Sequence, residues 1–85
     1  MLNSKCVYSD AYGEMVLALK TARHEKKLDQ EHLGRIIGKD QKFISRIESF
    51  NQIINIEELF EYCRSLEIDF SELVSKYAEN NHTVH

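Results

Sequence analysis

Residues 28–50, LDQEHLGRIIGKDQKFISRIESF, decide the fold of this 85-residue chain. Two apolar patterns with helical spacing lie in this stretch, over about residues 30–37 and 41–49, and only residues 38–40 separate them. A connection that short forces two helices to cross at a steep angle. Gly34 lies in the first of these helices and favours a close approach by the second, because a larger side chain would hold the helices apart.

Helical periodicity continues on both sides of this stretch. Good helix formers predict a first helix over about residues 10–27, and the pair Asn55 and Glu58 resembles a capping box that opens a fourth helix. A fifth helix is expected to begin at Asp69 or Ser71. The apolar side chains expected to face the core are Ala11, Met15, Ala18, Leu19, Ala22, Leu33, Ile36, Ile37, Phe43, Ile44, Ile47, Ile56, Leu59, Phe60, Cys63, Leu66, Phe70, Leu73, Val74 and Tyr77.

The composition agrees with an all-α class. The chain has no proline and three glycines, so it lacks the turn residues that an all-β sandwich or barrel requires. Its length suits one small domain. We therefore predict an N-terminal arm over residues 1–9, a five-helix domain over residues 10–79, and a flexible tail over residues 80–85.

Membrane, metal and enzymatic functions find no support in the sequence. No apolar run approaches the ~18 residues of a membrane span, and no signal peptide precedes the domain, so a cytoplasmic protein is expected. Cys6 and Cys63 are interpreted as reduced thiols. No nucleophilic triad, carboxylate pair or glycine-rich phosphate loop is present, which argues against an enzyme. No metal site or cofactor is expected, because nothing completes a ligand set with the four histidines, His24, His32, His82 and His85.

The net charge of −3 conceals an uneven distribution. Residues 20–46 carry eight basic and four acidic side chains, whereas residues 47–85 carry two basic and eight acidic ones. Such a division allows a protein to present a basic surface to a polyanion while the whole molecule remains soluble. A solvated surface with a chance asymmetry is the alternative interpretation of the same counts.

The sequence resembles the helix-turn-helix family of phage lambda repressor and Cro, the XRE family, over about residues 15–75. The motifs that carry the resemblance are Leu28-x-Gln30-x-x-Leu33-Gly34, Gly38 in the turn, Ile44-Ser45-Arg46-Ile47-Glu48, and Leu66-x-Ile68. The resemblance implies a five-helix lambda-repressor-like fold. It also implies that the second helix of the motif reads base edges in the major groove of double-stranded DNA.

The resemblance assigns roles to individual residues. Gln30 matches a glutamine that bonds a phosphate and often braces a base-contacting residue, and Arg23 with Glu48 matches a pair that ties the first helix to the third. Positions facing base edges are Gln41, Lys42 and Ser45, and Arg46 is expected to reach a phosphate or a guanine. Lys39 and Asn51 are expected to contact phosphates. The implied DNA-binding set is therefore Gln30, Lys39, Gln41, Lys42, Ser45, Arg46 and Asn51.

The sequence departs from the family pattern at both ends of the third helix. Phe50 stands where a glycine is common, and it opens a charge-poor loop that continues with Ile53 and Ile54. Asp40 stands where relatives often have proline or serine, so its carboxylate is expected to cap the helix while bringing negative charge close to the groove. A contribution of Phe50, Ile53 and Ile54 to a subunit contact is the alternative use of the loop.

Two functions follow from these patterns. The first is a sequence-specific transcriptional regulator that binds a pseudo-palindromic operator as a homodimer, because one small module makes few base contacts. The dimer surface is expected on the fifth helix, with Phe70, Leu73, Val74 and Tyr77. The second is a protein-interaction module, such as an antitoxin or regulatory adaptor, with weak or secondary DNA binding. The charge-poor loop and the net negative charge favour this alternative.

Overall fold

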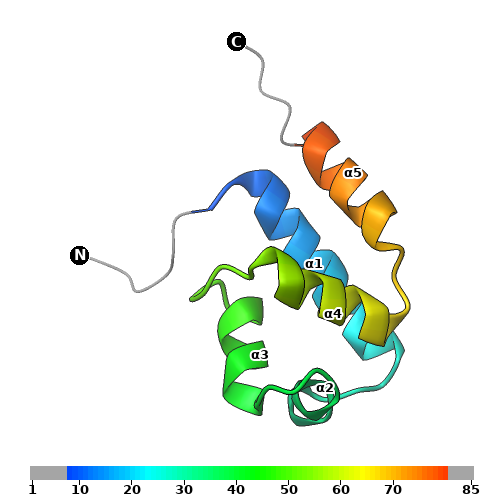
Figure 1. The fold of residues 1–85 in the computed structure, drawn as a ribbon. Helices are drawn as coiled ribbons and strands as arrows, with labels where there is room; N and C mark the ends of the chain where they lie inside the picture. The colour runs from blue at the N-terminus through cyan, green and yellow to red at the C-terminus, as the bar shows by residue number, and fades with distance from the viewer. Residues whose placement is uncertain (1–7, 81–85) are drawn as a thin grey trace, which may run out of the picture.

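The computed structural model describes residues 8–80, and every regular element in this part of the chain is an α-helix (Figure 1). The predicted all-α, five-helix architecture is therefore confirmed. The helices are α1 (Asp10–Glu25), α2 (Gln30–Ile36), α3 (Gln41–Glu48), α4 (Ile56–Leu66) and α5 (Phe70–Asn80). The first helix ends two residues earlier than predicted, because Lys27 adopts a left-handed conformation with φ 58°.

Side-chain caps fix where each of the five described helices begins. A cap oxygen accepts a hydrogen bond from the backbone N–H three residues on, satisfying one of the donors that a helix start leaves unpaired. Asn55 and Glu58 form the predicted capping box, each side chain accepting from the backbone N–H of the other, at 2.8 and 3.0 Å. The other N-cap side chains are Ser9 before α1, Asp29 before α2, Asp40 before α3 and Asp69 before α5.

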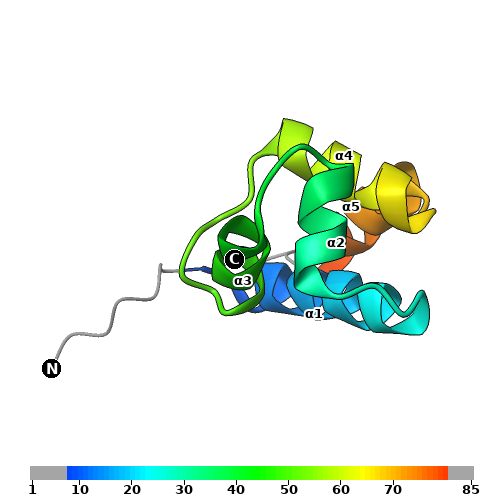
Figure 2. The same ribbon diagram turned by 90° about the horizontal axis from the view of Figure 1, so that it is seen from below.

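The core lies around α1, which contacts α3, α4 and α5. Helices α2 and α3 lie at one end of the molecule and α5 at the other (Figure 1). Viewed from below, α2 is seen from its side whereas α3 is seen nearly along its axis, so the two helices run in different directions (Figure 2). The fully buried side chains are Tyr62, Leu19, Leu33, Ile44, Ile47, Val16 and Cys63. Burial raises the pKa of the Cys63 thiol to about 11, so the thiol is protonated at neutral pH, whereas Cys6 lies outside the described residues.

Four side chains expected in the core are exposed instead. Ala18 lies outside the core, and Ile36, Ile56 and Phe60 expose 50%, 62% and 49% of their surface. Of the helices concerned, α2 and α4 are short and carry apolar residues on more than one face, so periodicity alone does not select the buried face. Tyr12 is buried in the core, although the predicted stripe omits it. Its hydroxyl donates to the carbonyl of Gln52 and accepts from the N–H of Ile54, so Tyr12 also fixes the loop before α4.

The face of α5 predicted to form a dimer surface packs against its own chain. Leu73 is buried in the core, and Phe70, Val74 and Tyr77 are partly buried against it. Ile54, predicted to thicken a subunit contact, is also buried in the core. Leu73 and Ile54 are therefore engaged in folding the monomer, whereas Val74 and Tyr77 also line a groove between α1, α4 and α5, so a dimer surface that includes α5 stays a prediction.

The α2–α3 connection depends on two glycines. A Cβ at Gly34 would lie 2.8 Å from the carbonyl carbon and oxygen of Asp40, so only glycine permits this approach without a backbone shift. Gly38 has a φ of 76°, a left-handed conformation that glycine adopts without steric cost. The predicted close approach at Gly34 is confirmed.

Substitution of Gly34 by alanine is expected to lower the free energy of unfolding by about 1–3 kcal/mol, because the new methyl group forces α2 away from the start of α3. Urea denaturation followed by circular dichroism measures the change. The control is His32→Ala, which truncates an exposed side chain of the same helix and should alter stability by about 0.5 kcal/mol or less. Equal stability of Gly34→Ala and the unmodified protein would contradict the steric argument.

Candidate nucleic-acid interface

Helix α3 has one buried and one solvent-facing side. Phe43, Ile44 and Ile47 are buried in the core. The opposite side presents Gln41, Lys42 and Arg46 as exposed residues and Ser45 as a partly buried one. The four predicted base-facing or phosphate-facing positions of this helix therefore lie together on its outer surface.

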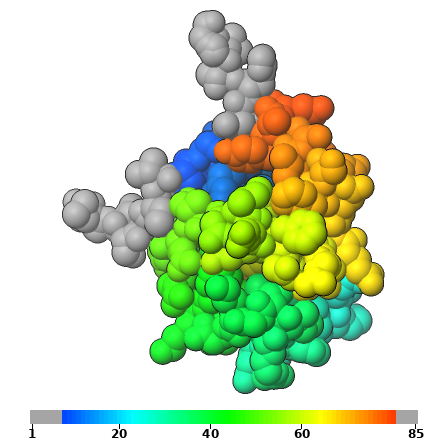
Figure 3. Space-filling view, viewed as in Figure 1, coloured from blue at the N-terminus to red at the C-terminus, as the bar shows by residue number. Residues whose placement is uncertain are grey.

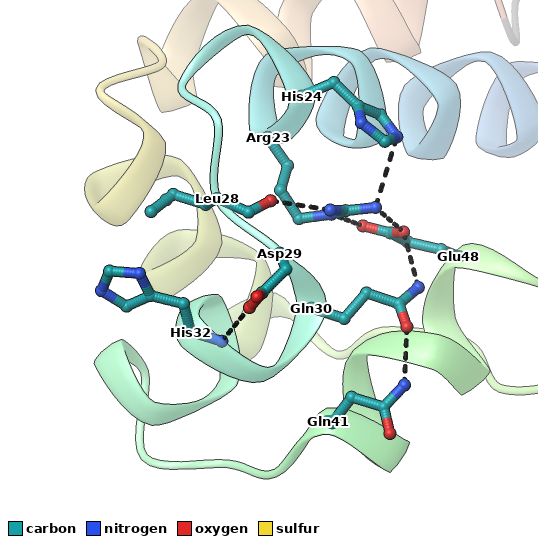
Figure 4. Close-up of polar contacts among 8 residues, drawn as sticks. All are labelled: Arg23, His24, Leu28, Asp29, Gln30, His32, Gln41 and Glu48. Carbon is teal, nitrogen blue, oxygen red and sulfur yellow. Dashed lines mark hydrogen bonds and ion pairs between the residues drawn. The ribbon is translucent and has the colours of Figure 1, made fainter.

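A chain of hydrogen bonds connects the interior to this outer surface (Figure 4). Arg23 on α1 donates to both carboxylate oxygens of Glu48 at the end of α3, at 2.7 and 2.8 Å. Gln30 at the start of α2 donates to the same carboxylate at 3.1 Å, and it accepts from the side-chain amide of Gln41 at 2.8 Å. Four side chains from three helices thus hold α2 and α3 in one relative orientation.

The inner part of this chain is a desolvated ion pair. The side chains of Arg23 and Glu48 are 6% and 3% exposed. The hydrogen-bonded carboxylate raises the pKa of Arg23 above its ordinary value, against the opposing effect of burial. The hydroxyl of the neighbouring Tyr62 has no hydrogen-bond partner among residues 8–80, and burial raises its pKa. The predicted structural role of the Arg23–Glu48 pair agrees with this geometry.

The predicted phosphate contacts outside α3 already have partners in the protein. The Lys39 ammonium lies 3.6 Å from a Glu58 carboxylate oxygen and 5.1 Å from the centroid of the Phe43 ring. The exposed Asn51 donates from its side-chain amide to the Ser49 hydroxyl at 3.0 Å. Both residues flank α3, but Lys39 must leave a carboxylate to meet a phosphate.

Two short helices joined by a tight turn, with the second presenting a polar face, define a helix-turn-helix. The family model described as helix-turn-helix, of the Cro and C1 type, matches residues 19–73. The chain belongs to this family. It therefore has the lambda-repressor-like fold and belongs to a DNA-binding family without enzymatic activity. The comparison with curated proteins gives no match.

Within residues 8–80, no three metal-binding side chains gather into a possible site. None of the five helices in the part of the chain that the structure describes is both long and apolar enough to span a membrane. Of the four histidines, His82 lies outside the described residues, as does His85.

The basic surface of this helix-turn-helix is weaker than the sequence predicts. The acidic second half folds back onto the basic segment and neutralises three of its cations. Lys42, by contrast, has no ion-pair partner among the described residues. The three ion pairs between the two segments are Arg23–Glu48, Lys26–Glu67 and Lys39–Glu58.

Two contacts of the interface could not be predicted from the sequence. Arg46 donates from Nε to the side-chain oxygen of Gln52 at 2.8 Å, so the loop after α3 orients this guanidinium. Glu58 reaches the turn from α4. Neither pair has a spacing that predicts it, because both depend on the path of the α3–α4 loop.

Replacement of Glu48 by glutamine is expected to cost about 3–5 kcal/mol of unfolding free energy, because it leaves the Arg23 charge buried without a counter-charge. Chemical denaturation measures this loss. The matched control is Glu31→Gln, which removes an exposed carboxylate that pairs with Arg35 and should cost no more than about 1 kcal/mol. Similar losses in both variants would show that the Arg23–Glu48 pair does not hold the fold together.

Proposed function

We propose that this helix-turn-helix protein is a sequence-specific transcriptional regulator that reads DNA with the outer face of α3. The observation that carries the proposal is the hydrogen bond from Gln41 to Gln30, which orients the first side chain of α3 before DNA arrives. A preoriented amide loses less side-chain freedom on binding than a free one does.

The proposed reading chemistry uses the donors that the network leaves unused. An amide nitrogen carries two N–H groups, and the network engages one on Gln41 and one on Gln30. Gln41 retains one N–H and its carbonyl oxygen, the pair that recognises adenine N7 and N6 in the major groove. The Lys42 ammonium is suited to donate to guanine O6 and N7. The Ser45 hydroxyl can donate to, or accept from, polar groups on a base edge.

The proposed phosphate contacts lie around this reading surface. The remaining N–H of Gln30 donates to one phosphate. The terminal nitrogens of Arg46 donate to another, while its Nε stays hydrogen-bonded to the side-chain oxygen of Gln52. Asn51 completes the set after α3, and Lys39 lies at the other end of the helix. Asp40 caps α3 through its contact with the N–H of Phe43, so part of its negative charge is balanced by the helix.

Charge reversal of Lys42 and Arg46 together is expected to weaken DNA binding at least tenfold. The slope of log affinity against log salt concentration is expected to become shallower by roughly 0.9 for each phosphate contact that is lost. Fluorescence anisotropy with a labelled duplex from the upstream region of the gene, compared with a scrambled duplex, measures both quantities. The matched control is Arg64→Glu with Lys76→Glu, which makes the same charge change on α4 and α5.

Absence of binding by the unmodified protein to either duplex at ~50 mM salt would overturn the proposal, because phosphate contacts are strongest at low salt. The protein-interaction alternative, an antitoxin or adaptor, would then be favoured. Equal weakening by the control substitutions would mean that net charge, rather than the face of α3, governs binding.

We further propose that the protein binds as a homodimer through the apolar surface beside the α3–α4 loop. Ile53, Ile56 and Phe60 expose 44%, 62% and 49% of their surface there. Ile53 and Ile56 border a groove of about 270 Å³ between α1, α4 and α5. In the space-filling view, α4 lies across the centre of this face, between α3 and α5 (Figure 3).

A second copy is the occupant that this surface suits. The groove is lined almost entirely by apolar side chains, and it adjoins the loop that leaves α3. A two-fold axis at this loop would place the two α3 helices on one face of the dimer, as two half-sites about one helical turn apart require. Because the exposed apolar surface is small, the dimer is expected to dissociate readily in solution. It is expected to form fully when two copies bind the two half-sites of one operator.

Ile56→Asp is expected to abolish dimerisation without unfolding the domain, because it places a charge in the apolar contact at an exposed position. Analytical ultracentrifugation with and without the upstream duplex measures the stoichiometry. Leu17→Asp is the matched control, since Leu17 is 53% exposed on α1 and lies outside the groove. A single protein bound to each duplex would contradict the homodimer and leave this surface for another protein.

A further inference from the structure

We infer that Glu58, on α4 outside the helix-turn-helix, limits DNA affinity by holding the Lys39 ammonium in competition with DNA phosphate. The inference rests on the proposed DNA-binding function and concerns its strength. In this arrangement Glu58 is a positioning residue that acts through Lys39.

The Lys39 side chain is held from two sides. Its ammonium lies 3.6 Å from Oε2 of Glu58 and 5.1 Å from the centroid of the Phe43 ring, the face of which attracts a cation. The Lys39 side chain is 41% exposed and that of Glu58 is 17% exposed. Partial burial strengthens this attraction relative to a fully solvated pair.

Glu58 itself is fixed by the local structure of α4. Its other carboxylate oxygen accepts a hydrogen bond from the backbone N–H of Asn55 at 3.0 Å, and the Asn55 side chain accepts from the N–H of Glu58 at 2.8 Å. The capping box therefore holds the carboxylate in place before Lys39 arrives. Of the two partners, only the long lysine side chain has freedom to move toward DNA.

The position of Lys39 beside α3 means that its ion pair with Glu58 affects the binding of DNA phosphate. Lys39 directly precedes Asp40, the N-cap of α3, and it lines one surface hollow together with Gln41 and Lys42 of the proposed reading surface. A phosphate that binds Lys39 must displace the carboxylate of Glu58, and that carboxylate then repels the phosphate. Because this penalty applies to every DNA sequence, the pair lowers the sequence-independent part of the affinity, which operator and scrambled DNA share.

The test is Glu58→Gln, which removes the charge and keeps the capping box, since glutamine serves at this position as well as glutamate. Affinity for a scrambled duplex is expected to rise about two- to fivefold, the range expected for loss of a partly exposed ion pair. The log–log salt slope is expected to steepen by up to about 0.9 as Lys39 gains a phosphate. Fluorescence anisotropy over a salt series gives both values, and thermal melting checks the fold.

Two further variants isolate the mechanism. In a Lys39→Gln background, Glu58→Gln should leave the salt slope unchanged and raise the affinity clearly less than it does with Lys39 present, because the competing cation is gone and only the repulsion between the carboxylate and the phosphate is relieved. Glu61→Gln makes the same charge change on α4 at a carboxylate that pairs with Arg64, and it should leave the affinity unchanged.

The outcomes separate the inference from the function beneath it. If the unmodified protein binds duplex DNA and Glu58→Gln binds equally or more weakly, the inference is wrong, and Glu58 instead presents Lys39 to the phosphate or has no influence. An equal rise with Glu61→Gln would also overturn it in favour of general electrostatics. If the unmodified protein binds no duplex, the proposed function fails and the inference fails with it.

Discussion

The buried ion pair between Arg23 and Glu48 is the constraint on which the helix-turn-helix arrangement depends. A desolvated pair contributes little net stability relative to apolar packing, but it tolerates only a narrow geometry. Here the two side chains come from the end of α1 and the end of α3, so the pair sets the distance between those helices. Because Gln30 shares the carboxylate and also holds Gln41, the interior geometry is transmitted to the outer face of α3. The core and the proposed reading surface are therefore one hydrogen-bonded unit.

The departure from the family pattern after α3 has a physical explanation. Phe50 occupies a position where glycine is common, and it adopts the left-handed conformation that glycine would adopt, with φ 65°. A side chain in this region carries a steric cost of about 1–2 kcal/mol. Two features offset that cost: the Phe50 ring stacks on Tyr8 at a centroid distance of 4.8 Å, and the N–H of Asn51 closes the end of α3 on the carbonyl of Arg46. The aromatic residue thus gains a packing contact that glycine lacks.

The parts of the fold that depend on neighbouring residues could be predicted from the sequence. The caps at Asp29, Asp40 and Asn55 act over three residues, so their patterns are visible in the chain. The inward faces of α2 and α4 could not be assigned reliably, because a helix of 7 or 11 residues with apolar residues on two sides has no unique stripe. Within the site, resemblance to the family supplied the positions on α3. The contacts of Arg46 and Lys39 depend on loop and inter-helix geometry, which no local spacing encodes.

The distribution of charge in three dimensions connects these observations to selectivity. Sequence-independent affinity for DNA grows with the number of cations free to meet phosphates. In this protein the acidic second half holds several cations of the basic segment, Lys39 among them, while the polar groups of α3 remain on the surface. Lowering the phosphate contribution lowers the affinity for every sequence alike, so the base contacts of α3 set the ratio of specific to non-specific binding, which is the quantity that matters among the many competing sites of a genome. A net charge of −3 is therefore compatible with a DNA-reading protein, provided that base contacts and the doubling of half-sites supply the affinity that the phosphates do not.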